Sequence, residues 1–202
     1  MLMRQDAKIM ARTSAPKTRA DTNIIRLKVT LRGVKPPVWR RLLMPGTMNL
    51  GQLHMAIQAT MGWHDSHLHV FDIGGDAFGD PRNVDDVADE KRPTLNDLLR
   101  SSVVLFGYIY DFGDNWEHTI AFEKSDLPVE GESYPVCIGG KRNCPPEDCG
   151  GAWGYELLLG ILADPKHPEH EDQVEWIGEE FDSNEFDLKR ANSALAARFT
   201  KK

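Results

Sequence analysis

The chain has 202 residues, of which 41% are hydrophobic and 27% are charged, and its formal net charge is −7. This length and composition indicate an ordinary globular protein with a substantial core. The negative charge argues against a broad nucleic-acid surface on the folded body, and no apolar stretch reaches the roughly 20 residues of a membrane-spanning helix. Three cysteines without a recognisable secretory signal predict a cytoplasmic protein with no membrane partner.

Residues 1–22 are predicted to be a disordered basic arm. The segment has no apolar periodicity, and its basic residues are Arg4, Lys8, Arg12, Lys17 and Arg19. Such an arm can contact nucleic acid through counterion release, although a solvated tail explains the same composition. Residues 23–202 are expected to form a single domain, so any nucleic-acid partner is expected to be bound through the arm.

The first half of the domain predicts two strands, a helix and a third strand. Polar and apolar residues alternate over residues 24–31 and 38–44, as in half-buried strands. Leucine, isoleucine and methionine then recur at helical spacing over residues 49–61. Residues 67–73 predict a strand with His67 and His69 on one face.

The region that follows predicts a loop, a short helix and a β-hairpin. Residues 74–92 read as a long acidic loop, and Thr94 is expected to cap a helix that runs to about Leu99. Residues 105–112 and 116–123 then give the strongest hairpin signal in the chain.

The register of that hairpin depends on the length of its loop. If Gly113 and Asp114 form a two-residue loop, Asp111 lies opposite Trp116 and diagonal to His118 on the same face. A longer loop would shift the register and could remove the adjacency of Asp111 and His118.

The last third of the chain is predicted to be mainly helical. A strand is expected over residues 134–138, and helices over residues 152–162, 168–176 and 186–199. Because strands and helices do not alternate regularly, the expected fold class is α+β. The sheet should be mainly antiparallel, with a helix after the first two strands and a helical C-terminal segment.

Five ordered motifs resemble the plasmid pRiA4b ORF-3-like family. They are PPVWRR at residues 36–41, a helix motif at residues 53–63, HLHVF at residues 67–71, YDFGDNWEH at residues 110–118 and CPPEDCGG at residues 144–151. The resemblance runs from about residue 24 to residue 199. It implies a single α+β domain and a link to plasmids or insertion elements, and it supplies no catalytic residues.

Several polar residues are candidates for one ligand-binding cleft between the first helix and the sheet. Such a mixture of carboxylates, imidazoles and thiols is costly to bury unless it is paired or ligated. The candidate ligand-binding residues are Arg40, His54, His67, His69, Asp111, Asp114, Trp116 and His118. A polar network or ordinary turn chemistry would explain many of the same residues.

The sequence leaves two kinds of metal site open. A zinc ion could be bound by His118, Cys137, Cys144 and Cys149, which supply thiolate and imidazole ligands. A mixed set of Asp111, Asp114, His118 and Glu147 would favour a harder or borderline divalent ion. Buried cysteines without a metal are also common, so the cofactor stays unassigned.

Three classes of function fit these residues. The first is a cytosolic accessory or binding domain whose polar cleft takes a protein partner, a small polar ligand or a metal. The second is a metal-dependent or thiol enzyme that uses the same cleft. The third is a nucleic-acid accessory factor of a mobile element, acting through the basic arm, Arg40 and Arg41.

Overall fold

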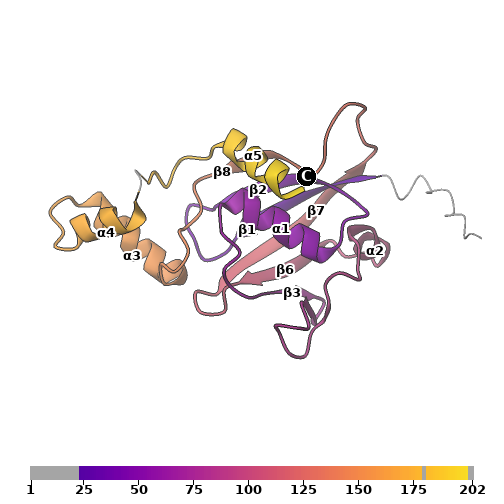
Figure 1. The fold of residues 1–202 in the computed structure, drawn as a ribbon, viewed down its shortest axis with the longest axis horizontal. Coiled ribbons are helices and arrows are strands. Elements are labelled where there is room, and N and C mark those ends of the chain that lie inside the picture. The colour runs from indigo at the N-terminus through magenta and orange to yellow at the C-terminus, as the bar shows by residue number, and fades with distance from the viewer. Residues whose placement is uncertain (1–22, 179–180, 200–202) are drawn as a thin grey trace, which may run out of the picture.

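The computed structural model describes residues 23–178 and 181–199, and these residues form an α+β fold. An eight-stranded sheet has the order β5-β4-β3-β6-β7-β1-β2-β8 (Figure 1). Its paired strands are antiparallel except for β4 and β5, which are parallel. The expected fold class is confirmed, with one helix after the first two strands and helices at the C-terminal end. The expected basic arm lies outside the described residues.

The strands follow the chain in this order: β1 (Ile24–Leu31), β2 (Trp39–Pro45), β3 (His69–Ile73), β4 (Asp76–Gly79), β5 (Ala88–Asp89), β6 (Leu105–Tyr110), β7 (Trp116–Asp126) and β8 (Val136–Lys141). The helices are α1 (Leu50–Met61), α2 (Leu95–Arg100), α3 (Gly151–Ala163), α4 (His170–Ile177) and α5 (Leu188–Phe199). The predicted elements are present with shifted ends. The expected loop over residues 74–92 differs, because it contains β4 and β5.

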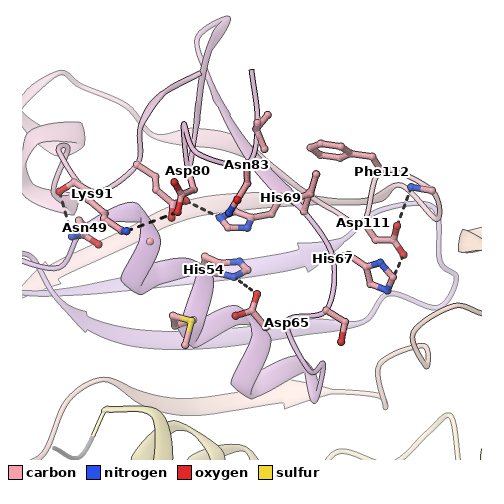
Figure 2. A pocket seen from close by; sticks show the side chains of 17 residues that line it. Asn49, His54, Asp65, His67, His69, Asp80, Asn83, Lys91, Asp111 and Phe112 are labelled. Atoms are coloured by element: carbon pink, nitrogen blue, oxygen red, sulfur yellow. Dashed lines mark hydrogen bonds and ion pairs between the residues drawn. The ribbon is translucent and has the colours of Figure 1, made fainter. Parts of the chain in front are cut away.

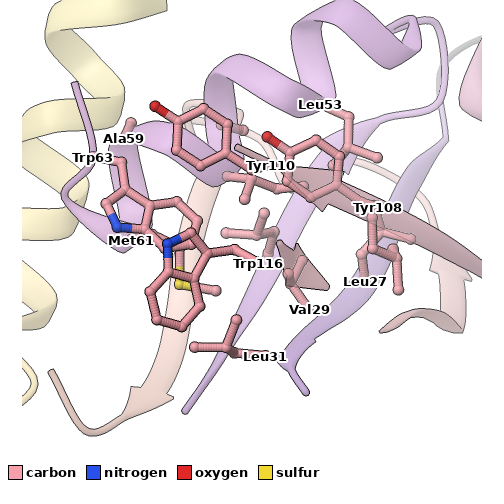
Figure 3. Close-up of a cluster of buried hydrophobic side chains, with 14 of the residues drawn as sticks. Leu27, Val29, Leu31, Leu53, Ala59, Met61, Trp63, Tyr108, Tyr110 and Trp116 are labelled. Atoms are coloured by element: carbon pink, nitrogen blue, oxygen red, sulfur yellow. The ribbon is translucent and has the colours of Figure 1, made fainter. Parts of the chain in front are cut away.

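The core lies between one face of the sheet and α1. Alternation in β1 turns Leu27, Val29 and Leu31 to this face, where they are almost completely buried. Leu53 of α1 packs onto the same cluster together with aromatic rings from β6 and β7 (Figure 3). Helix α5 lies beside α1 and β8, whereas α3 and α4 pack together to one side of the sheet (Figure 1).

Helix α1 has defined ends that orient the chain on both sides of it. Asn49 caps the N-terminus, and its side chain and that of Gln52 form a reciprocal capping box. Gly62 ends the helix in the left-handed conformation, with φ of 90°. Residues 63–68 then connect the helix to β3, and the backbone N–H groups of Ser66 and His67 donate to the hydroxyl of Tyr110 in β6.

The β6–β7 hairpin is confirmed, but its loop is longer than two residues. Tyr110 lies opposite Trp116 and Tyr108 lies opposite His118, so residues 111–115 form the connection. Asp111 therefore leaves the strand and is not opposite Trp116. The physical reason is a side-chain turn, in which Asp111 has φ of 58° and its Oδ1 accepts the N–H of Gly113 at 2.9 Å.

Within residues 23–178 and 181–199, no helix combines the length and apolar character needed to cross a membrane.

The sheet core predicts a strong position dependence for leucine truncation. Leu27 is completely buried in β1, whereas Leu105 at the start of β6 is 58% exposed. We expect Leu27→Ala to lower the free energy of unfolding by about 2–5 kcal/mol, because it opens a cavity in a close-packed core. The matched control Leu105→Ala should change it by less than about 1 kcal/mol. Urea unfolding of the three proteins measures both effects, and equal losses would contradict this core.

Candidate functional site

A cavity of about 930 Å³ opens between α1, the segment before β3, the acidic loop and the β6–β7 turn (Figure 2). Its ionisable lining residues are His54, Asp65, His67, His69, Asp80, Glu90, Lys91 and Asp111. Four of the expected ligand-binding residues, His54, His67, His69 and Asp111, thus lie around one cavity. Arg40, Asp114, Trp116 and His118 do not line it.

His54 is the buried polar centre of the wall formed by α1. Its Nε2 lies 2.8 Å from Asp65 Oδ1, and its Nδ1 lies 2.8 Å from the Tyr108 hydroxyl. Gln58 Nε2 donates to that hydroxyl at 3.2 Å, while Gln58 Oε1 accepts the backbone N–H of Asp65 at 3.1 Å. The four residues therefore form a closed ring of hydrogen bonds.

The ring assigns a proton position to His54. Burial lowers the pKa of His54, and the hydrogen bond with Asp65 offsets this effect only in part. A neutral imidazole satisfies the ring when Nε2–H donates to Asp65 and Nδ1 accepts the O–H of Tyr108. Burial acts to raise the pKa of Asp65, but its hydrogen bond with His54 and the nearby charges outweigh this and lower it.

A second histidine–carboxylate pair stacks on the first. His69 Nε2 lies 2.7 Å from Oε2 of Glu90, a residue that is only 4% exposed. The rings of His54 and His69 are 3.5 Å apart at their centroids and nearly parallel, with an interplanar angle of 6°. Glu90 comes from the end of the acidic loop, so this contact joins the loop, β3 and α1.

His67 stands at the other end of the cavity, beside the β6–β7 turn. Its Nε2 is 3.2 Å from Asp148 Oδ1 and 3.7 Å from Asp111 Oδ2. Within the described residues, His67, Asp111 and Asp148 are the single group of three or more possible ligands whose donor atoms all lie within 4.8 Å. The structure thus offers a different potential metal set from the two that the sequence suggested.

Known proteins resemble this chain in both sequence and fold. The sequence model of the plasmid pRiA4b ORF-3-like protein family matches residues 23–190. The chain belongs to this family. A relative in Sinorhizobium fredii (strain NBRC 101917 / NGR234), described as uncharacterized protein y4hQ, is 40% identical over an alignment of 187 residues, which covers 89% of this chain and 96% of the relative.

A solved structure also matches this pRiA4b ORF-3-like chain. It is the crystal structure of a protein of unknown function, MM3350 from Methanosarcina mazei Go1, with a TM-score of 0.77 and 41% identity. The match covers 83% of this chain and 96% of the solved one. The names of these relatives assign no ligand or reaction.

His118, the centre of both suggested metal sets, lies in the core and away from the cavity. It is 2% exposed and makes an edge contact with the Trp63 ring at 5.4 Å, and neither ring nitrogen makes a hydrogen bond of good geometry among the described residues, although the backbones of Trp116 and Tyr108 are close enough to offset in part the effect of burial on its pKa. Trp116 is buried beside Trp63, at a centroid distance of 6.0 Å. The reason is the hairpin register, which turns both residues toward α1.

The three cysteines do not assemble with His118 into a zinc site. Cys137 Sγ donates to the Gly139 carbonyl at 3.4 Å, and Cys144 is 5% exposed within the core. Burial raises the pKa of Cys144, and burial together with the charge of Asp114 raises the pKa of Cys149 to about 12. The thiols are therefore protonated at neutral pH, which does not suit a thiol nucleophile.

The remaining members of the suggested sets have local structural partners. Asp114 Oδ2 accepts the backbone N–H of Gly150 at 3.2 Å, and Glu147 accepts hydrogen bonds from the Tyr110 hydroxyl and from His64. These bonds fasten the loop before α3 to the sheet and to the end of α1. Neither carboxylate belongs to a group of metal ligands among the described residues.

Arg40 is buried and does not line the cavity. Its Nε donates to the Thr60 carbonyl at 2.8 Å, and its Nη1 donates to the carbonyls of Trp39 and Lys141. The guanidinium also stacks on Phe186, with Cζ 4.3 Å from the ring centroid. Arg40 thus joins β2 and β8 to α1 and to the segment before α5.

Sequence reasoning missed Asp65, Tyr108, Glu90 and Asp148 as neighbours of the candidate histidines. Glu90 belongs to the expected acidic loop, but it is buried. Asp65 lies three residues after the glycine that ends α1, and it contacts His54 and Gln58 of the same helix. A carboxylate just beyond such a helix end was the available signal; nothing in the sequence indicated the other three.

The buried His118 predicts a measurable loss of stability in acid. Burial lowers the pKa of His118 from 6.5 to about 4. Below pH 6.5 His118 therefore becomes protonated in the unfolded chain but stays neutral in the folded chain. The contribution of neutral His118 to the free energy of unfolding is thus complete at neutral pH and is lost as the pH falls toward 4. By about pH 4.5 we expect His118 to cost about 2–3 kcal/mol of unfolding free energy.

The measurement is urea unfolding at several pH values for the natural protein and for His118→Phe, which keeps a ring in the core but cannot be protonated. The difference in unfolding free energy between neutral pH and about pH 4.5 should be smaller in the variant by about 2–3 kcal/mol. An identical pH dependence in the two proteins would show that His118 is not buried in its neutral form.

Proposed function

We propose that the protein is a binding domain whose cavity takes a small organic cation, such as a primary amine or polyamine. The observation that carries this proposal is the charge of the lining. Four carboxylates, Asp65, Asp80, Glu90 and Asp111, face the cavity against one ammonium group, that of Lys91. A lining of this kind raises the local concentration of cations and repels anions.

Two of these four carboxylates account for the excess of negative charge around the cavity. Asp80 is already paired with Arg82 and Lys91, and Asp65 has Arg198 at 3.8 Å. Glu90 and Asp111 have no lysine or arginine partner within ion-pair distance in the described part of the chain. Both are nearly buried, and a buried carboxylate without a cationic partner is unfavourable. A positively charged ligand would relieve this cost.

The cavity also offers apolar surface for the carbon chain of an amine. Met55, Leu68, Val84 and Phe112 line it between the polar groups. Phe112 is 48% exposed in the β6–β7 turn and lies near the end of the cavity that holds His67 and Asp111 (Figure 2). Alternating carboxylates and apolar side chains suit a ligand in which ammonium groups are separated by methylene groups.

This proposal refines the binding-domain hypothesis. We place the protein in the cytosol because its three cysteines are free thiols, which suits a reducing compartment. An association with plasmids or insertion elements is supported by the family description alone. Recognition of nucleic acid through Arg40 is not part of the proposal, since Arg40 is buried, and Arg41 is held by Glu123 through two hydrogen bonds of 2.7 and 2.8 Å.

One observation favours an enzyme as the second candidate. His69 donates its Nε2–H to Glu90 when the imidazole is neutral, and its Nδ1 has no hydrogen bond within the described residues. An imidazole held by a buried carboxylate on one nitrogen, with a lone pair on the other, is the arrangement of a general base. His54 lacks this property because both of its nitrogens are engaged.

Calorimetric titration of the chelator-treated protein with spermidine tests the binding proposal. We expect saturable binding that weakens as salt rises, and no binding of citrate at the same concentrations. Glu90→Gln retains an acceptor for His69 but removes the charge, so it should weaken spermidine binding about 30-fold, or about 2 kcal/mol. The matched control Glu130→Gln alters an exposed glutamate outside the cavity and should have no effect. Equal binding by Glu90→Gln would count against this cavity.

Turnover of an activated ester separates the two candidates. With p-nitrophenyl acetate, a general base at His69 predicts many product molecules per protein molecule, and this activity should be lost in His69→Gln. The histidine control is His167→Gln, because His167 lies outside the cavity. A binding domain predicts the same slow background hydrolysis with all three proteins.

A further inference from the structure

The cluster of His67, Asp111 and Asp148 has contacts that a simple ion pair does not explain. Nε2 of His67 is buried and has no hydrogen bond of acceptable geometry among the described residues, although two carboxylate oxygens lie at 3.2 and 3.7 Å. A protonated imidazole beside two carboxylates would normally point its N–H at one of them. Here the nitrogen and one oxygen of each carboxylate instead lie within 4.8 Å of one another without a hydrogen bond between them.

Asp111 supplies a second, independent sign of an absent partner. Its side chain is only 9% exposed, and Oδ1 accepts the backbone N–H of Gly113 at 2.9 Å. Oδ2, the atom that faces His67, has no hydrogen bond within the described residues. A nearly buried carboxylate that holds one oxygen through the backbone and leaves the other without a hydrogen bond is oriented for a ligand on that side.

We propose that His67, Asp111 and Asp148 bind a divalent first-row transition-metal ion such as Mn²⁺ or Zn²⁺. The three donor atoms lie within 4.8 Å of one another, so small rotations of the side chains bring all of them to one ion. One imidazole and two carboxylates form a borderline-to-hard ligand set, and their two negative charges balance the charge of the ion. This site contains no thiol and does not depend on the cavity binding an organic cation.

The position of the site leaves room for further ligands on the ion. Asp148 is at the surface, with 70% of its side chain exposed, whereas Asp111 closes the inner side. Three protein ligands and an open outer side are typical of ions that keep water or bind a substrate group. Because His67 and Asp111 also line the cavity, the ion would lie at the mouth of the cavity.

The ion would also connect three segments that are distant in sequence. His67 precedes β3, Asp111 lies in the β6–β7 turn, and Asp148 lies in the loop before α3. The turn and the start of α3, just after this loop, are already close together. A Cβ atom added at Gly151 would lie only 2.4 Å from the carbonyl oxygen of Asp114 in the turn. Binding should therefore stabilise the folded protein, since the unfolded chain does not hold these ligands together.

The test is a titration of the chelator-treated full-length protein with Mn²⁺, followed by calorimetry and by the melting temperature. We expect one Mn²⁺ per chain and a higher melting temperature, with much weaker binding of Mg²⁺. Mn²⁺ is the primary probe because it prefers oxygen and imidazole ligands to thiols, so the cysteines should not compete. Zn²⁺ should bind to the same site more tightly.

Two variants test the ligand assignment. Asp148→Asn changes an exposed side chain and His67→Gln removes the imidazole, and each should weaken Mn²⁺ binding at least tenfold. The matched controls are His170→Gln, in α4, and Asp85→Asn, at an exposed aspartate, and both residues lie outside the cluster. Both controls should bind Mn²⁺ as the natural protein does.

Two results would overturn the proposal: no Mn²⁺ bound by the natural protein, or full binding by both Asp148→Asn and His67→Gln. The outcome is separable from that for the organic cation. Glu90→Gln should retain Mn²⁺ binding, since Glu90 is not in the cluster, and spermidine is titrated into chelator-treated, metal-free protein. Either proposal can therefore fail while the other stands.

Discussion

The constraint on which the site depends is the need to satisfy an imidazole buried between α1 and the sheet. His54 is 4% exposed, and a polar group at such a position is unfavourable unless each of its hydrogen-bonding atoms has a partner. The ring through Asp65, Tyr108 and Gln58 meets this requirement with a helix residue, a strand residue and the turn after the helix. It therefore fixes the turn after α1 against β6, and with it the segment that carries the other site histidines.

The stacked pair of imidazoles extends this constraint to the acidic loop. His69 stacks on His54 with ring centroids 3.5 Å apart, and Glu90 fixes the His69 ring through its contact with Nε2. Glu90 in turn approaches the helix so closely that a Cβ at Gly51 would lie 2.9 Å from Glu90 Oε1. The loop is thus attached by a buried carboxylate, and its charge stays inside the cavity. The negative charge of the cavity thus comes in part from Glu90, the same residue that attaches the acidic loop to the cavity wall.

The sequence predicted the fold well because apolar periodicity reports which residues face the core. It predicted the site only in part, because the site depends on loop lengths and on contacts between distant segments. The two-residue loop at Gly113 would have placed Asp111 beside His118; the longer turn instead puts Tyr108 and Tyr110 on the buried face and Asp111 at the cavity. The pairing of His69 with Glu90 had no local signal in the sequence. It depends on the path of the whole acidic loop, which brings Glu90 back beside β3.

The two proposed ligands would oppose each other electrostatically. Asp111 lines the cavity and also belongs to the cluster with His67 and Asp148, so a divalent ion there would neutralise one of the two carboxylates that lack a cationic partner. Its remaining charge would repel an ammonium group across a partly desolvated space, where charges interact more strongly than in water. Each ligand must weaken the other by the same factor, because coupling between binding sites is reciprocal. Metal availability would then set the affinity of the cavity for amines.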